Sequence, residues 1–147
     1  MENFKQTNLD DNILRAISEM GFATPTTVQA KTIPHLLNTD TDLIATAQTG
    51  TGKTAAFGLP SIHLTDLKKK DTSTLVLCPT RELCIQIAKD LTKYSKYIDG
   101  LKILAVYGGS DIRGQIKALN KGVHIVIGTP GRTKDLIKRD KLKIGNI

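Results

Sequence analysis

The sequence predicts an α/β fold in which a parallel β-sheet is flanked by helices. Short apolar runs alternate with stretches of helical periodicity along most of the chain, which is typical of strands joined by helical crossovers. The chain has 147 residues, of which 39% are hydrophobic and 24% are charged. These values suit one globular domain with one sizeable core, and they exclude disordered, collagen-like and disulfide-scaffold classes.

Two helices are expected before the first strand. Residues 8–20 have apolar side chains at helical spacing, and Gly21 favours a stop after them. A second helix is expected to open at residues 24–26, and Pro34 is expected to break or kink it. We assign these elements to residues 1–40.

Four apolar runs are expected to be strands buried on both faces, because they are short, continuous and bounded by turn residues. They are residues 43–45, 75–78, 103–106 and 123–127. The helices expected between them cover residues 53–67, 81–97 and 111–120, and a further helix begins near Gly131. Residues 41–147 are therefore predicted to form a parallel α/β core.

A glycine-rich loop follows the first expected strand and precedes an apolar helix. Its sequence is Ala47-Gln48-Thr49-Gly50-Thr51-Gly52-Lys53-Thr54. This is the pattern of a nucleotide phosphate-binding loop (P-loop), with alanine at the first glycine position. The glycines let backbone amides approach phosphate oxygens, Lys53 neutralises the outer phosphates, and the Thr54 hydroxyl can bind Mg²⁺. A glycine-rich turn that caps a helix is the structural alternative.

The charge is divided unevenly along the chain. Residues 1–66 have four basic and seven acidic side chains, whereas residues 67–147 have seventeen basic and seven acidic ones, so the net charges are −3 and +10. A basic half favours an anionic polymer such as nucleic acid. A solvated surface that keeps the protein in solution explains the excess equally well.

Further short motifs flank the P-loop. Residues 21–29 precede it, and three loop-to-helix junctions follow the later expected strands: Pro79-Thr80-Arg81-Glu82-Leu83, Gly108-Gly109 with Gln115 beyond, and Thr129-Pro130-Gly131-Arg132. Free amides, threonine hydroxyls and guanidinium groups converge on anions at such junctions, so the junctions suit a sugar-phosphate backbone. Helix caps, surface charges and a simple turn are the alternatives.

From Phe4 to about Arg132, these motifs together resemble the amino-terminal RecA-like domain of DEAD-box ATP-dependent RNA helicases. The resemblance implies a RecA-like P-loop fold that binds ATP and Mg²⁺. It also implies that Gln29 reads the adenine edge and that Phe4 stacks on the ring, with Phe22 and Thr24 in the same motif. The three junctions would contact RNA through phosphate and sugar, with little sequence specificity.

The chemistry of Gln29 supports this role. A carboxamide has one acceptor and two donors, so it can pair with the N6 amino group and N7 of adenine, whereas guanine presents two acceptors there. A preference for ATP over GTP is therefore predicted. Phe22 is equally consistent with a core anchor beside the site.

The resemblance also implies that the chain is incomplete at its carboxyl end. It stops at Ile147, before the Asp-Glu-Ala-Asp segment and the second RecA-like domain of the family, which would be its partner in the parent protein. We expect the parent to unwind short RNA duplexes, and these 147 residues to bind nucleotide weakly with negligible RNA-stimulated hydrolysis. An unfilled sheet edge would cause marginal stability or self-association. Another P-loop enzyme such as a kinase, and a non-catalytic RNA- or nucleotide-binding module, are the alternatives.

The remaining reactive side chains are expected to be structural. Cys78 and Cys84 fit no zinc or redox spacing and are expected to be reduced, buried thiols. His124 is expected in the core, and His35 and His63 lack a nucleophile or carboxylate partner in any recognisable motif. The polar amino terminus and the absence of a long apolar run indicate no signal peptide and no membrane span, so a cytoplasmic location is expected.

One residue departs from the family pattern within an expected helix. Thr133 follows Arg132 where many relatives have an apolar residue. We expect this difference to affect how that helix packs, but not the loop before it.

Overall fold

The computed structural model describes residues 1–147 and contains one 3-10 helix, six α-helices and three β-strands. The chain forms two compact units: residues 1–64 with 90–99, and residues 65–89 with 100–147. The predicted division at residue 40 stays a prediction. None of the helices combines the length and the apolar character that crossing a membrane requires.

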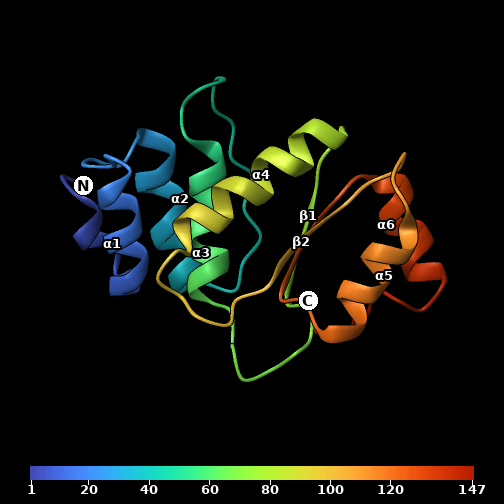
Figure 1. The fold of residues 1–147 in the computed structure, drawn as a ribbon. Helices are drawn as coiled ribbons and strands as arrows, with labels where there is room; N and C mark the ends of the chain where they lie inside the picture. The colour runs from blue at the N-terminus through green and yellow to red at the C-terminus, as the bar shows by residue number, and fades with distance from the viewer. The chain divides into compact units, whose positions relative to one another are not determined.

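The first unit is helical (Figure 1). It contains η1 (Phe4–Thr7), α1 (Asp11–Glu19), α2 (Thr27–Asn38) and α3 (Lys53–His63). Asp10 caps α1, since its side chain accepts a hydrogen bond of 2.8 Å from the amide of Asn12. The buried core residues of this unit include Ile13, Ile17, Ile33, Leu59 and Leu91. The two helices expected before the P-loop and the helix after it are confirmed, although the last ends before residue 67.

Pro34 does not break its helix, and the alternative expectation of a kink stays a prediction. Helix α2 continues past the proline to Asn38, whose side-chain amide donates to the carbonyl of Pro34 at 2.7 Å. A proline inside a helix removes one backbone hydrogen bond and costs about 3 kcal/mol. Packing of α2 against α3, with Ile33 fully buried, offsets that cost.

The strand expected at residues 43–45 is also wrong. The segment is irregular, Ile44 is 94% exposed, and the segment pairs with none of the three strands. An extended segment becomes a strand only when a neighbouring backbone satisfies its amides and carbonyls. The apolar run was therefore not sufficient to predict a strand, since the structure pairs it with none of the three strands.

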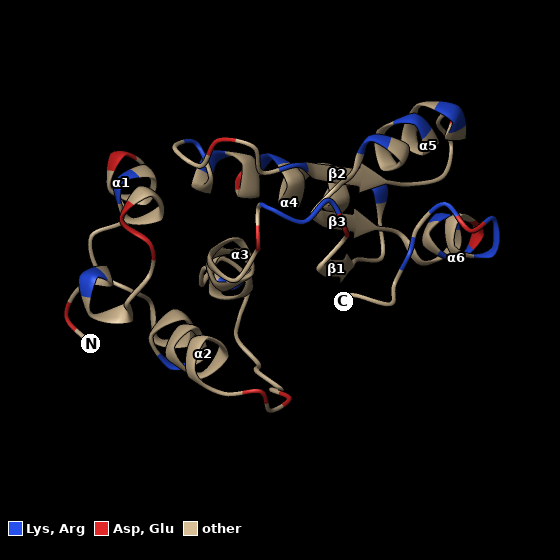
Figure 2. Ribbon diagram, turned by 90° about the horizontal axis from the view of Figure 1, so that it is seen from below, with Lys and Arg blue, Asp and Glu red and all other residues tan.

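The second unit contains a parallel three-stranded sheet, as predicted. Its strands are β1 (Thr74–Leu77), β2 (Ile103–Val106) and β3 (Ile125–Gly128), in the order β1-β3-β2 (Figure 2). Both Thr74 and Ile103 lie opposite Ile125 in the register. Only β3 is buried along its whole length, so the expectation of burial on both faces is wrong for β1 and β2, which are the edge strands.

Helices follow each strand of this sheet. They are α4 (Arg81–Tyr94), α5 (Ile112–Lys121) and α6 (Pro130–Lys138), and α4 ends before the predicted residue 97. Helices α5 and α6 pack on the sheet around the buried side chains of Val106, Val123, Val126, Leu136 and Leu142. The junctions after β2 and β3 are therefore held on an apolar layer.

Candidate nucleotide and nucleic-acid sites

The P-loop is a tight turn that leads into α3. Gly50 and Gly52 have φ angles of +79° and +81°, a left-handed conformation that favours glycine. The hydroxyl of Thr51 donates to the carbonyl of Gln48 at 2.6 Å, and the ammonium group of Lys53 donates to the carbonyl of Ala47 at 2.9 Å. The first amides of α3 have no intrahelical acceptor, so the loop presents donors suited to an anion.

Gln29 holds the P-loop from the side. Its Nε2 donates to the carbonyl of Gly52 at 3.1 Å, and its Oε1 accepts from the amide of Thr26 at 3.0 Å. Together with the Thr26 hydroxyl, this forms a capping box at the start of α2. A Cβ atom at Gly52 would overlap the Gln29 amide, so Gly52 is required both by its φ angle and by this contact.

The amide of Gln29 keeps part of its hydrogen-bonding capacity. A carboxamide has two donor hydrogens and an oxygen with two lone pairs, and the bonds to Gly52 and Thr26 use one of each. One donor and one acceptor remain, which is the set that the adenine edge requires. The side chain is only 3% exposed, so a base would have to approach it closely.

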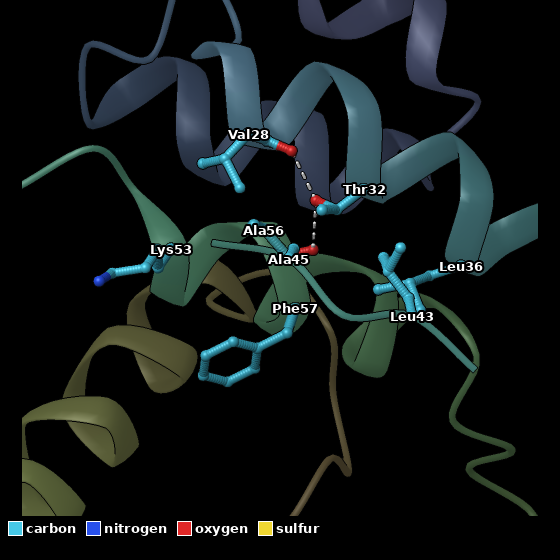
Figure 3. Close-up of a pocket in the computed structure, with 8 residues that line it drawn as sticks. All are labelled: Val28, Thr32, Leu36, Leu43, Ala45, Lys53, Ala56 and Phe57. Carbon is cyan, nitrogen blue, oxygen red and sulfur yellow. Dashed lines mark hydrogen bonds between the residues drawn. The ribbon is translucent and has the colours of Figure 1, made fainter. Parts of the chain in front are cut away.

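Two cavities lie beside the P-loop in the first unit. The larger, of about 700 Å³, is lined by residues of α2 and by the segment from Leu43 to Thr51. The smaller, of about 360 Å³, lies between α2 and α3 and is mostly apolar (Figure 3). In it, the Thr32 hydroxyl donates to the carbonyl of Val28 at 2.8 Å and lies 3.4 Å from that of Ala56. Neither cavity is lined by an aspartate or a glutamate.

The aromatic residues of the first motif pack together. The ring centroids of Phe4 and Phe22 lie 6.2 Å apart, and those of Phe22 and Tyr94 lie 6.0 Å apart. Burial raises the pKa of Tyr94 to about 12. Phe4 is buried and Thr24 is exposed. Phe22 thus packs as a core anchor would, and the adenine contacts of Phe4, Phe22 and Thr24 stay predictions.

The first two junctions of the second unit lie side by side. The Arg81 guanidinium lies 4.9 Å from the centroid of the Tyr107 ring, and a Cβ at Gly109 would lie 3.8 Å from Arg81 Nη1. Gly109 has a φ of +78°. The Thr80 hydroxyl accepts from the amide of Leu83 at 3.2 Å and so caps α4.

Arg132 joins the third junction to the second. Its guanidinium donates to Gln115 Oε1 at 2.9 Å and to the carbonyl of Ser110 at 3.1 Å. The amide of the buried Gln115 donates in turn to the Ser110 hydroxyl at 2.9 Å and to the carbonyl of Tyr107 at 3.3 Å. The two residues predicted to contact RNA therefore also hold the loop after β2 in place.

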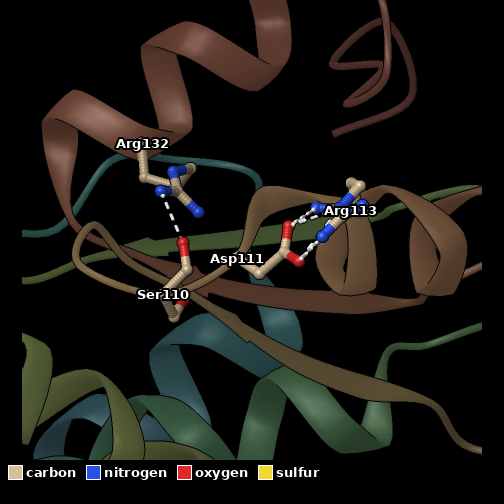
Figure 4. Close-up of polar contacts among 4 residues, drawn as sticks. All are labelled: Ser110, Asp111, Arg113 and Arg132. Carbon is tan, nitrogen blue, oxygen red and sulfur yellow. Dashed lines mark hydrogen bonds and ion pairs between the residues drawn. The ribbon is translucent and has the colours of Figure 1, made fainter.

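A neighbouring ion pair shares no hydrogen bond with this network. Arg113 pairs with Asp111, which also caps α5, and Arg132 points instead toward Ser110 (Figure 4). Hydrogen bonds from Arg113 lower the pKa of Asp111 below its usual value. The Arg113 side chain is 88% exposed, so the pair contributes little to the fold.

We call the three junctions the basic loop cluster. It consists of residues 79–81, 108–109 and 129–132, and further Lys and Arg residues occur along α5 and α6 (Figure 2). Most of its residues are exposed, and the side chain of Thr129 makes no capping bond to α6. Hydroxyls, helix-start amides and guanidinium groups together favour phosphate. Sequence reasoning missed Ser110 and Tyr107, although both adjoin the glycine pair.

The hydroxyl of Thr133 differs from the other buried polar side-chain atoms, which have hydrogen-bond partners. It is 3% exposed, and its hydroxyl is buried without a hydrogen-bond partner. A Cβ at Gly128 would overlap this hydroxyl. The expected difference in packing is therefore a polar atom buried between α6 and β3.

His124 lies in the core, as predicted, and the other two histidines make hydrogen bonds within the first unit. His124 is buried, its Nδ1 accepts from the amide of Lys102 at 3.0 Å, and its Nε2 lies 2.9 Å from the carbonyl of Lys69. His63 accepts from the backbone of Asp10, and His35 contacts threonine hydroxyls. No group of three or more His, Cys, Asp or Glu side chains could hold a metal ion.

A parallel sheet flanked by helices, with a P-loop at the start of a helix, defines a RecA-like P-loop domain. Residues 26–147 match the family described as DEAD/DEAH box helicase, and the chain belongs to that family. This membership favours the helicase class over the kinase alternative.

Known relatives agree with this assignment. The chain is 50% identical over its whole length to an ATP-dependent RNA helicase CshA of Listeria monocytogenes and 44% identical over 98% of its length to the ATP-dependent RNA helicase DeaD of Escherichia coli. It spans only 28% and 23% of these relatives. Among solved structures, 99% of the chain superposes on 39% of a DEAD box protein from Methanococcus jannaschii, with a TM-score of 0.93 and 46% identity. The whole chain also superposes on 37% of S. cerevisiae Dbp5 bound to RNA and ADP BeF3, with a TM-score of 0.89 and 27% identity.

Proposed function

We propose that these residues are the ATP-binding and RNA-binding part of an ATP-dependent RNA helicase that unwinds short RNA duplexes. The observation that carries the proposal is the hydrogen bond from Gln29 to Gly52, because it joins the predicted adenine-reading amide to the phosphate loop. A P-loop alone is compatible with many nucleotides. A P-loop fixed to a glutamine that keeps one donor and one acceptor favours adenine.

The residues present fit ATP with Mg²⁺. The left-handed glycines leave the loop backbone open to phosphate oxygens, and Lys53 exchanges its bond to the Ala47 carbonyl for the outer phosphates. Thr54 is the second residue of α3 and offers the hydroxyl that would bind Mg²⁺. When bound, Mg²⁺ neutralises charge on the phosphates, while the chain binds and orients the nucleotide.

The basic loop cluster is the proposed RNA site. Thr80, Arg81, Thr129 and the exposed glycines suit phosphate and ribose oxygens, so binding would have little sequence specificity. Gln115 and Arg132 would act at least in part by holding the loop that contains Gly108 and Gly109. The net charge of +10 over residues 67–147 supports the same ligand.

Efficient hydrolysis would need groups that the P-loop cavities do not provide. Phosphoryl transfer requires an oriented water and stabilised charge in addition to the phosphate cradle, and no carboxylate lines either cavity. We therefore propose weak nucleotide binding and negligible RNA-stimulated hydrolysis for these residues alone. In the parent protein, a second RecA-like domain would close over ATP and RNA together. The two reduced thiols favour a cytoplasmic location.

Two titrations of the 147-residue chain test the proposal. ATP should bind more tightly than GTP, and the affinity for single-stranded RNA should fall with salt by a log–log slope of about −0.7 per neutralised phosphate. A salt-independent RNA interaction would contradict the phosphate contacts. RNA-dependent ATP hydrolysis that Lys53→Ala abolishes would contradict the proposed inactivity of these residues alone.

A further inference from the structure

The fold brings together two thiols that the sequence spacing does not link to any motif. Cys78 directly follows β1 and Cys84 lies in the first turns of α4, and their sulfur atoms are 2.8 Å apart. They are the only two cysteines in the chain, and both are free and buried. Between them lie Pro79, Thr80 and Arg81, the first junction of the basic loop cluster.

We propose that Cys78 and Cys84 form a redox-sensitive dithiol that closes reversibly to an intramolecular disulfide across this junction. A disulfide has a sulfur–sulfur length of about 2.05 Å, so the sulfurs need to approach by less than about 1 Å. The backbone at both ends is already fixed: the amide of Cys78 donates to the carbonyl of Gly128 at 3.0 Å, and that of Cys84 donates to the carbonyl of Thr80 at 3.1 Å. These bonds hold the two thiols at the ends of one short segment.

The two sulfurs have different roles in the reaction. Cys84 is completely buried, and burial raises its pKa to about 12, so it keeps its proton near neutral pH. Cys78 is 8% exposed and is the sulfur that a small oxidant reaches first. Its environment also includes the carbonyls of Thr80 and Gly128, each 3.9 Å from the sulfur.

A peroxide is the class of oxidant that fits such a confined site. The sulfur of Cys78 attacks one oxygen of hydrogen peroxide, the O–O bond breaks, and the departing hydroxide leaves as water with the Cys78 proton, so that a sulfenic acid remains. The sulfur of Cys84 then attacks that of Cys78, the S–O bond breaks, and the second hydroxide leaves with the Cys84 proton as water. The two thiols lose two electrons, and one peroxide is reduced to two waters.

The consequence for RNA rests on the proposed function. A disulfide would tie the end of β1 to α4 on either side of Thr80 and Arg81, which the proposal places against phosphate. Closing so short a loop restricts the backbone that must adapt to the ligand. We expect the oxidised protein to bind single-stranded RNA at least about fivefold more weakly, the lower end of typical coupling between sites.

The test treats the reduced chain with hydrogen peroxide, alkylates the remaining thiols and measures the mass of the intact protein and its peptides. The expected product is a monomer that has lost two hydrogen atoms, resists alkylation, and recovers both thiols with dithiothreitol. In Cys84→Ala, Cys78 should stop at a sulfenic acid that dimedone traps, whereas in Cys78→Ala the remaining thiol should stay unreacted. Two alkylatable thiols after treatment, or a disulfide only between molecules, would overturn the proposal.

RNA titrations separate this inference from the function on which it depends. Peroxide should weaken RNA binding by the wild type and leave the double variant Cys78→Ala/Cys84→Ala unchanged. An oxidised wild type with a proven disulfide and undiminished RNA affinity would overturn the coupling. If the reduced wild type did not bind RNA, the proposed function would fail, while the mass measurement would still decide whether the disulfide forms.

Discussion

The P-loop and the basic loop cluster are both built where an extended segment leads into a helix, but they are supported differently. The segment before the P-loop pairs with no strand, and the loop is held by Gln29 and by its own side chains. The loops of the cluster follow paired strands, and a network from Arg132 through Gln115 joins two of them. The comparison shows that a loop leading into a helix can be positioned either by side-chain hydrogen bonds or by a preceding strand that is paired in a sheet.

The largest effect is expected at the P-loop lysine. Lys53→Ala removes the only charge in the loop, and a charge-assisted bond contributes about 1.5–3 kcal/mol, so ATP affinity should fall roughly 10–150-fold. Titration with a fluorescent ATP analogue measures the change. Lys93→Ala, another exposed lysine of the same unit, should bind ATP like the wild type. Equal losses in both variants would show that net charge, and not the loop, determines binding.

Gln29→Glu tests the support that α2 gives to the P-loop. The carboxylate can still accept from Thr26, but it cannot donate to Gly52 or to adenine N7. The preference for ATP over GTP should shrink by about 1–3 kcal/mol, as the ratio of the two dissociation constants reports. Gln86→Glu, on the exposed face of α4, provides the matched control. If Gln29→Glu left the ratio of the ATP and GTP dissociation constants unchanged, the proposed contact between Gln29 and adenine would be wrong.

The network in the cluster predicts coupled losses of RNA affinity. Arg132→Ala and Gln115→Ala should each weaken RNA binding, and the double variant should lose less than the sum, because both changes free the same loop. Arg113→Ala removes only an exposed ion pair and should have little effect. If Arg132 acted only on phosphate, Gln115→Ala would bind RNA normally and the losses would add.

A smaller effect is expected in stability. Thr133→Val replaces a buried, unpartnered hydroxyl by a methyl group of similar size, so the free energy of unfolding should rise by about 1 kcal/mol. Urea unfolding followed by circular dichroism measures it. The exposed residue Thr92 provides the control Thr92→Val, which should change stability less. A loss of stability in Thr133→Val would mean that the hydroxyl has a partner in solution.

The three strands of the sheet were predictable from sequence. Each is a short apolar run, and each also has a neighbouring strand to which its backbone can hydrogen-bond. Residues 43–45 show the limit: an apolar run predicts burial, but a strand also needs a partner, which periodicity does not report. Pro34 shows a second limit: the rule that proline ends a helix fails here, because packing of α2 against α3 outweighs the cost of the proline. The P-loop and its glutamine were predictable from residue types, whereas the bond between Gln115 and Arg132, and the contact between the two cysteines, depend on tertiary geometry.

The central claim is that one unit binds ATP and the other binds RNA, and crossed titrations of one pair of variants test it most directly. ATP and single-stranded RNA are titrated against wild type, Lys53→Ala and Arg81→Ala, with circular dichroism to establish that each is folded. We predict that Lys53→Ala has a reduced affinity for ATP and an unchanged affinity for RNA. Arg81→Ala should have a reduced affinity for RNA and an unchanged affinity for ATP. A folded wild type that binds neither ligand, or folded variants that each lose both equally, would contradict the account.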